Sequence, residues 1–267
     1  MHLLRGQNPA ELKPIPKVIR ASDLAVYSPA NHTGTSNVRV IGPETVGATA
    51  LEVLIGTIVK SHGAKPHAHP RLEQCAYMIE GTGESGAEGR MEAMEPGTWA
   101  YVPAGVFHSF RVTSDQPGRL LVVYTPPYGE NPEHTITQPD GAAAVPALGR
   151  VRVLAASDAA TGTVPLIDRE TAGARWVDIA TLRMPAGSAS VCTTEPDAEQ
   201  VLYIEDGRID ARVDGQDFGL APGDFLFLPR GAAASLRCSP EQSASGFLIK
   251  GRLPSTATHP LPNGDNS

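Results

Sequence analysis

Apolar residues along this chain fall in short runs, and most of these runs are closed by Gly, Pro or a polar turn. In the first half they include CAYMIEG (75–81), TWAYVPAG (98–105), HSFRV (108–112) and RLLVVYTP (119–126). These runs are rich in β-branched and aromatic residues, which favour strands over helices. Many short strands at close spacing are typical of a sandwich or barrel, so the pattern predicts an all-β fold with little helix.

The chain also repeats itself. A shift of 126 positions, as from Glu73 to Glu199, superimposes two segments without a gap, most clearly residues 41–125 on residues 167–251. Further identical pairs are Ile41 with Ile167, Gln74 with Gln200, Tyr77 with Tyr203, Gly97 with Gly223, Pro103 with Pro229 and Arg111 with Arg237. One constant offset over so many identities indicates two homologous β-domains.

The repeat and the distribution of Pro and Gly predict five segments. They are an N-terminal arm (1–40), a first domain (41–126), a linker (127–150), a second domain (151–253) and a tail (254–267). The linker is rich in Pro, Gly and small residues, as connecting segments usually are.

Composition excludes several classes of function. The formal net charge is −7, from 22 basic and 29 acidic residues, and Lys and Arg form no cluster, so we expect no nucleic-acid partner. No apolar run reaches the ~20 residues of a membrane-spanning helix, so we expect no membrane partner. Cys75, Cys192 and Cys238 show no CxxC spacing. Such sparse cysteines favour a reducing, cytoplasmic location over a disulfide framework.

Histidines gather in two stretches of the first domain. His67 and His69 are two residues apart, so on a strand both side chains leave the same face. A Glu-Gln pair follows at residues 73–74. The second stretch has the spacing Gly-x5-Pro-x-Gly-x2-His, formed by Gly97, Pro103, Gly105 and His108. Together the two stretches resemble the paired motifs of the cupin superfamily.

The resemblance implies two tandem cupin barrels, which are double-stranded β-helix or jelly-roll domains, with a metal ion in the first. Three neutral imidazoles and one oxygen ligand also suit a borderline divalent ion on chemical grounds, such as Fe, Mn, Ni, Co or Zn. We therefore expect one such ion per chain, held by His67, His69, His108 and a fourth side chain.

Two residues compete as the fourth ligand. Gln74 keeps the usual spacing of the family motif before Gly81, and related cupins with a Glu-Gln pair use the Gln. Glu73 has the chemical advantage, because a carboxylate binds a hard divalent ion better than an amide does. Only one can point inward, since adjacent strand residues face opposite sides. We favour Gln74, which would leave all protein ligands neutral and the ion's full double charge available as a Lewis acid.

The second domain lacks these ligands. The repeat places Thr193, Glu195, Gln200 and Ala234 where the first domain has His67, His69, Gln74 and His108. Without an imidazole, the second barrel is expected to bind no metal and to serve the structure.

Other residues near the motifs are candidates for a substrate pocket. Lys65 has the parity of His67 and would steer a carboxylate to the metal, although a surface lysine is an equal interpretation. Tyr77, Trp99, Tyr101 and Phe110 are expected to form aromatic walls, and for Trp99, Tyr101 and Phe110 a place in the core is an equal interpretation. Cys75 is expected to be a small buried hydrophobe. His32 and His134 are given no role.

These features predict a metal-dependent enzyme that acts on a small polar metabolite with a carboxylate, keto or enol group. Lewis-acid, non-redox chemistry of the isomerase, lyase or hydrolase type is the first expectation. An Fe(II)-dependent cupin dioxygenase is one alternative, and a cupin that binds a small ligand without turning it over is the other. The expected partners are the small-molecule substrate and a second copy of the chain in a homodimer.

Overall fold

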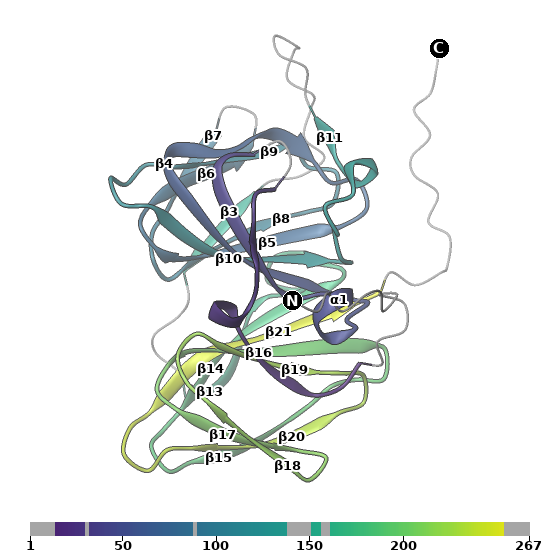
Figure 1. The fold of residues 1–267 in the computed structure, drawn as a ribbon, viewed down its shortest axis with the longest axis vertical. Helices are drawn as coiled ribbons and strands as arrows, with labels where there is room; N and C mark the ends of the chain where they lie inside the picture. The colour runs from purple at the N-terminus through teal and green to yellow at the C-terminus, as the bar shows by residue number, and fades with distance from the viewer. Residues whose placement is uncertain (1–13, 30–31, 88–89, 138–150, 156–160, 254–267) are drawn as a thin grey trace, which may run out of the picture.

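The protein folds almost entirely into β-strands, as its pattern of short apolar runs predicts. The computed structural model describes residues 14–29, 32–87, 90–137, 151–155 and 161–253 (Figure 1). Within these ranges the helical elements are the four-residue α1 (Pro43–Val46) and two 3-10 turns, Ala21–Asp23 and Pro132–His134. The all-β prediction is confirmed.

Two barrels follow one another along the chain (Figure 1). The first is built from β3 (His32–Ile41), β4 (Glu52–Ala68), β5 (Glu73–Glu80), β6 (Gly83–Ala87), β7 (Arg90–Met94), β8 (Thr98–Val102), β9 (His108–Val112) and β10 (Gly118–Thr125). The second is built from β13 (Gly162–Ile167), β14 (Val177–Met184), β15 (Ala189–Thr193), β16 (Ala198–Asp206), β17 (Ile209–Val213), β18 (Gln216–Leu220), β19 (Asp224–Leu228), β20 (Ala233–Cys238) and β21 (Ala244–Arg252).

The structure reproduces the internal repeat strand by strand. The bounds of β17, β18 and β19 are those of β6, β7 and β8 with 126 added to each residue number. The second barrel divides into two sheets, one of five of its strands to which β1 (Lys17–Arg20) adds a sixth and one of four strands, which is the arrangement of a double-sheet jelly roll. Both barrels therefore share one fold.

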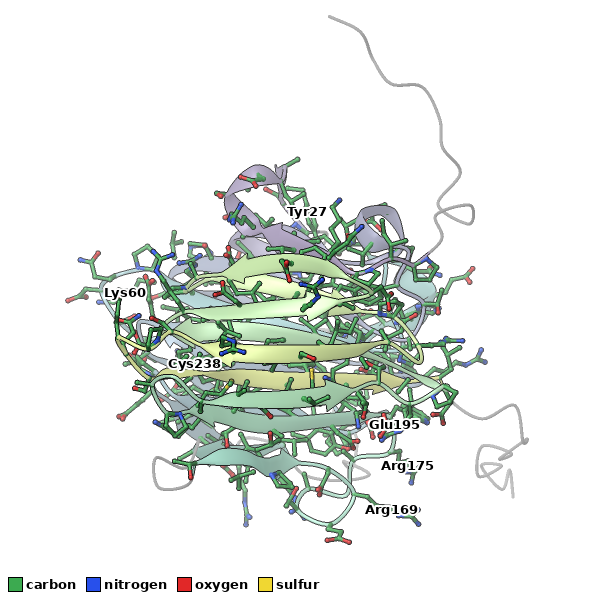
Figure 2. All side chains as sticks on the ribbon, turned by 90° about the horizontal axis from the view of Figure 1, so that it is seen from below. Tyr27, Lys60, Arg169, Arg175, Glu195 and Cys238 are labelled. Carbon is green, nitrogen blue, oxygen red and sulfur yellow. The ribbon has the colours of Figure 1, made fainter. Side chains whose placement is uncertain are left out.

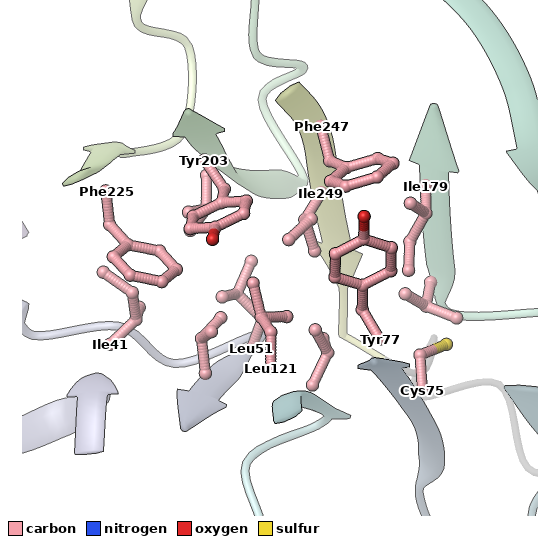
Figure 3. Close-up of a cluster of buried hydrophobic side chains, with 14 of the residues drawn as sticks. Ile41, Leu51, Cys75, Tyr77, Leu121, Ile179, Tyr203, Phe225, Phe247 and Ile249 are labelled. Atoms are coloured by element: carbon pink, nitrogen blue, oxygen red, sulfur yellow. The ribbon is translucent and has the colours of Figure 1, made fainter. Parts of the chain in front are cut away.

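A shared hydrophobic core joins the barrels. Tyr77 from β5 packs against Phe247 from β21, with ring centroids 4.7 Å apart (Figure 3). Because side chains alternate along a strand, Cys75 and Tyr77 of β5 face this core, whereas Ala76 between them faces the interior of the first barrel. Alternate residues along a strand thus have different roles: those on one face hold the two barrels together, and those on the other face line a barrel.

Two buried glutamates join the barrels reciprocally. The carboxylate of Glu73 accepts hydrogen bonds from the backbone N–H groups of residues 175–177 in the second barrel, at 2.9–3.2 Å. Its counterpart Glu199 accepts from the backbone N–H groups of residues 49–50 in the first barrel, at 2.8–3.0 Å. Since 49 plus 126 is 175, the two contacts are the same interaction repeated. This explains why both halves have Glu at this position.

Strand pairing crosses the expected domain boundaries. From the N-terminal arm, β1 (Lys17–Arg20) pairs with β19 of the second barrel. Conversely, β12 (Arg152–Ala155), expected in the second domain, pairs with β8 of the first. From the linker, β11 (Ile136–Thr137) pairs with β4, and from the arm β2 (Val26–Tyr27) pairs with β3. The boundaries at residues 40 and 150 therefore need correction, because these short strands cover sheet edges that would otherwise be unpaired.

Replacement of Glu199 by Ala tests the reciprocal contact. The substitution leaves two backbone N–H groups and the Thr49 hydroxyl without their acceptor. We expect the free energy of unfolding to fall by about 2–4 kcal/mol, measured by urea denaturation. The matched control is Glu92→Ala on the exposed face of β7, which should change stability little. Equal stability of the two variants would contradict the role assigned to Glu199.

Candidate metal centre

Three histidines from two strands converge in the first barrel. His67 lies near the end of β4, His69 directly follows that strand, and His108 begins β9, where it is the register partner of His67. Each histidine offers one ring nitrogen to the cluster, and these three nitrogens lie within 4.8 Å of one another. All three side chains are buried. The expected histidine cluster is therefore formed.

Backbone carbonyls fix the orientation of each imidazole. Nδ1–H of His67 donates to the carbonyl oxygen of Lys65 at 2.7 Å, and Nδ1–H of His108 donates to that of Val106 at 3.0 Å. Nδ1–H of His69 donates to the carbonyl oxygen of His134 at 3.0 Å. With the proton held on Nδ1, the lone pair is on Nε2 in all three rings, which is the usual preparation of a histidine for metal binding.

The cluster keeps its imidazoles neutral. Burial is the main reason that the pKa values of His67, His69 and His108 are lowered, and the neighbouring rings lower those of His69 and His108 further. The pKa of His69 falls to about 4. Neutral rings offer their lone pairs at physiological pH. The Nε2 atom of His69 is buried without a hydrogen-bond partner in the described part of the chain, as expected of an atom directed at an ion.

Gln74 lies at the cluster, and its amide oxygen is 3.0 Å from Nε2 of His108. Both atoms are acceptors when His108 carries its proton on Nδ1. A cation that contacts both atoms would satisfy both lone pairs. Without a cation, rotation of the Gln74 amide lets its N–H group donate to Nε2 of His108 instead. Glu73, the alternative ligand, faces the other barrel and accepts hydrogen bonds from three backbone N–H groups there. It also accepts one from the hydroxyl of Tyr101 in its own barrel, at 2.9 Å. The geometry favours Gln74 and contradicts Glu73.

A segment after β10 encloses the cluster on one side. The ring of Tyr128 lies 4.9 Å from that of His69, and the hydroxyl of Thr135 lies 3.3 Å from Nδ1 of His69. The carbonyl oxygen of His134 belongs to the same segment. His134 was expected to have no role, and no periodic pattern marks this segment, so its contribution through backbone atoms could not be predicted.

A cavity of about 70 Å³ adjoins the cluster inside the first barrel. Its described lining includes Gln74 and His108, and Phe110 is the expected pocket residue that reaches it. His32, which was expected to have no role, also lines it, with its ring centroid 6.3 Å from that of His67. The cavity is thus open to the face on which the metal ligands converge.

The other expected pocket residues lie elsewhere. Tyr77, which Figure 3 shows, lies in the core between the barrels. Trp99 and Tyr101 belong to the same core, because all three side chains leave the sheet on the face opposite to that of Gln74. Lys65 is exposed, and only its backbone carbonyl contributes to the site. The pocket prediction is wrong for Tyr77, and for Lys65, Trp99 and Tyr101 the structure shows the alternative interpretation, a place on the surface or in the core. Cys75 is a buried core residue, as expected.

The second barrel has no comparable cluster at the equivalent positions. Glu195 is on the surface near the edge of the barrel, and its carboxylate pairs with the ammonium of Lys250 at 2.7 Å (Figure 2). Thr193 is exposed, whereas Gln200 and Ala234 are buried. Aliphatic side chains such as Leu202, Leu226 and Leu236 pack together inside this barrel. The structure supports the division between a ligand-bearing and a structural barrel.

In the part of the chain that the structure describes, no helix has the length and apolar character that a membrane crossing requires.

Comparisons with known proteins agree with this architecture. Residues 55–124 match the family model for the Cupin domain (Cupin_2). An uncharacterized protein from Aquifex aeolicus is 33% identical over 63 residues, which are 24% of this chain and about half (51%) of that relative. Protein Ylba from E. coli superimposes with a TM-score of 0.69 at 16% identity, covering 92% of this chain and 94% of that one. Oxalate decarboxylase from Bacillus subtilis does so with a TM-score of 0.65 at 14% identity, covering 88% and 76%.

These findings define the class of protein as a double-barrel cupin fold with a histidine cluster in one barrel. Residues 55–124, which lie in the first barrel, are a matched cupin domain. The identities to the solved structures are low, so those likenesses show the fold and leave the substrate open.

Replacement of His108 by Ala tests the metal site. We expect purified wild-type protein to bind about one divalent ion per chain in equilibrium dialysis followed by elemental analysis, and His108→Ala to bind none. Glu195→Ala, at the position equivalent to His69 in the second barrel, is the matched control and should retain the ion. Loss of metal in Glu195→Ala would count against the division of roles between the barrels.

The fourth ligand can be tested with adjacent residues. Gln74→Ala should weaken metal affinity about 10–100-fold in a competition assay with a chromophoric chelator, because it removes a donor at the ion. Glu73→Gln should leave that affinity within about threefold of wild type while lowering thermal stability, because Glu73 bonds the second barrel. If Glu73→Gln weakened metal affinity and Gln74→Ala did not, Glu73 would be the fourth ligand.

Proposed function

We propose that this protein is a metal-dependent enzyme that acts on a small metabolite bearing a carboxylate, keto or enol group, by Lewis-acid chemistry without a change of redox state. The observation that carries the proposal is the set of three buried imidazoles whose Nδ1 atoms are held by carbonyl oxygens. This arrangement fits a divalent ion of the Fe, Mn, Ni, Co or Zn type, held by His67, His69, His108 and Gln74.

When bound, such an ion would polarise a substrate oxygen and stabilise negative charge that develops on it. The four side chains that would hold the ion are all neutral, so they leave its double charge uncompensated. The described wall of the cavity beside the cluster adds few charged groups of its own. Burial raises the pKa of Tyr124 well above its usual value, so this cavity-lining residue remains a neutral phenol. A phenol can donate a hydrogen bond to an oxyanion and help to position the substrate.

The absence of Glu73 from the cluster supports the non-redox reaction over the dioxygenase alternative. Many non-haem iron oxygenases hold their metal with a carboxylate beside histidines. Here the only carboxylate considered for that role is engaged by the second barrel. The amide of Gln74 stands in its place and leaves the site a stronger Lewis acid.

Turnover assays on metal-loaded protein test this function. Protein loaded with Mn(II), Co(II), Ni(II) or Zn(II), or anaerobically with Fe(II), would be incubated with a panel of hydroxy-, keto- and enol-carboxylates. We expect NMR to show conversion of a panel member, without oxygen uptake at an electrode. The conversion should be lost in His108→Ala and retained in Glu195→Ala.

Two results would contradict the proposal. Conversion that consumes oxygen in proportion to substrate would identify an iron dioxygenase. Tight binding of a panel member to the metal-loaded protein without any conversion would identify a ligand-binding cupin.

A further inference from the structure

The geometry points to a particular class of ligand for this site: a metal-chelating oxygen head followed by a short, uncharged, mostly apolar tail that lies over the neighbouring side chains of Ala76 and Ala100. This inference rests on the proposed function, because the head needs the metal. It goes further by assigning what the rest of the ligand must be, and which residues select it.

A row of small and aliphatic side chains extends from the metal ligands. Ala76 of β5 and Ala100 of β8 are register partners, and Val122 of β10 is the partner of Ala76 on its other side. All three line the cavity. Gln74 is two residues before Ala76 on the same face of β5, so its side chain is about 7 Å away along the strand. A ligand whose head contacts the ion beside Gln74 therefore directs its next atoms toward this row.

The described wall of the cavity offers such a tail no permanently charged partner, because its ionisable side chains are the imidazoles of His32 and His108 and the phenol of Tyr124. It contains neither lysine nor arginine, and neither aspartate nor glutamate. Lys65, the basic residue expected to steer a carboxylate, is exposed and outside the cavity. A second carboxylate on the ligand would lose its hydration without gaining a counter-ion, which is strongly unfavourable. The site thus favours ligands with one anionic head over dianions.

The second barrel shows what keeps the space open. At the positions equivalent to Ala76 and Ala100 it has Leu202 and Leu226, and both leucines are packed in its interior. Another pair of facing positions keeps one large and one small side chain in both barrels. In the first barrel Gly56 pairs with Leu120, and at the equivalent positions of the second barrel Leu182 pairs with Gly246.

At Ala76 and Ala100, in contrast, a small side chain at one position is not balanced by a large one at the other. Both positions carry the smaller residue in the first barrel and the larger one in the second. Their small methyl groups therefore leave space above this part of the cavity wall, which leucines at the same positions would fill. A cavity of about 70 Å³ has space for a tail on the order of two to four carbon atoms, given that one water occupies ≈ 30 Å³ in the liquid.

Binding of 2-oxo acids to Co(II)-loaded protein tests the inference, with the visible spectrum of the ion as the signal. Pyruvate, 2-oxobutanoate and 2-oxopentanoate share one chelating head and differ by single methylenes. We expect the dissociation constant to tighten about fourfold per methylene. 2-Oxoglutarate, in which a carboxylate replaces the terminal methyl of 2-oxopentanoate, should bind at least about tenfold more weakly than 2-oxopentanoate.

Substitutions in the alanine pair identify the selecting residues. Ala100→Leu and, as an independent second variant, Ala76→Leu should abolish the gain from added methylenes while leaving pyruvate within about twofold of wild type. Ala93→Leu on the exposed face of β7 is the matched control and should keep the wild-type series. Circular dichroism and bound Co(II) establish that each variant is folded.

The outcomes separate this inference from the proposed function. Failure of the wild-type protein to bind Co(II) would overturn both. Bound Co(II) with a flat 2-oxo acid series, with no spectral response to any acid, or with 2-oxoglutarate as the tightest ligand would overturn the inference and leave the metal site standing. A series that keeps its slope in both alanine variants would overturn the assignment of these residues.

Discussion

Hydrogen bonds from three imidazole Nδ1–H groups to backbone carbonyl oxygens are the interactions on which the site depends. The acceptors belong to Lys65 on β4, Val106 before β9 and His134 in the segment after β10. Because backbone atoms hold the rings, the fold itself selects the tautomer and presents the Nε2 lone pairs inward. A shift of any of these three segments would turn a ring away, so the chemistry depends on the integrity of the whole first barrel.

The two barrels share a structural plan but differ in what fills them. The contact of Glu73 with the second barrel is repeated by Glu199 with the first, and residues of matching parity form the core between them. Inside, the first barrel has polar ligands and small side chains, whereas the second has packed leucines. The polar, partly empty interior of the first barrel is energetically unfavourable. The well-packed second barrel stabilises the first.

The fold could be predicted because its signals are local and repeated. Short apolar runs indicated strands, and the constant offset of 126 residues matched the strands of the two barrels. Tyr77 was misplaced although its strand parity, opposite to that of Gln74, already excluded it from the cavity. The contribution of His134 was different in kind. A backbone carbonyl on an irregular segment leaves no trace in residue type or period, so only the tertiary structure reveals it.

X-ray absorption spectroscopy of the zinc-loaded protein tests the central claim most directly, because it reports the atoms around the ion without reference to activity. The account predicts three imidazole nitrogens at about 2.0–2.1 Å, further oxygen ligands and no sulfur. A spectrum with fewer than three imidazoles, or with thiolate sulfur in the shell, would contradict it.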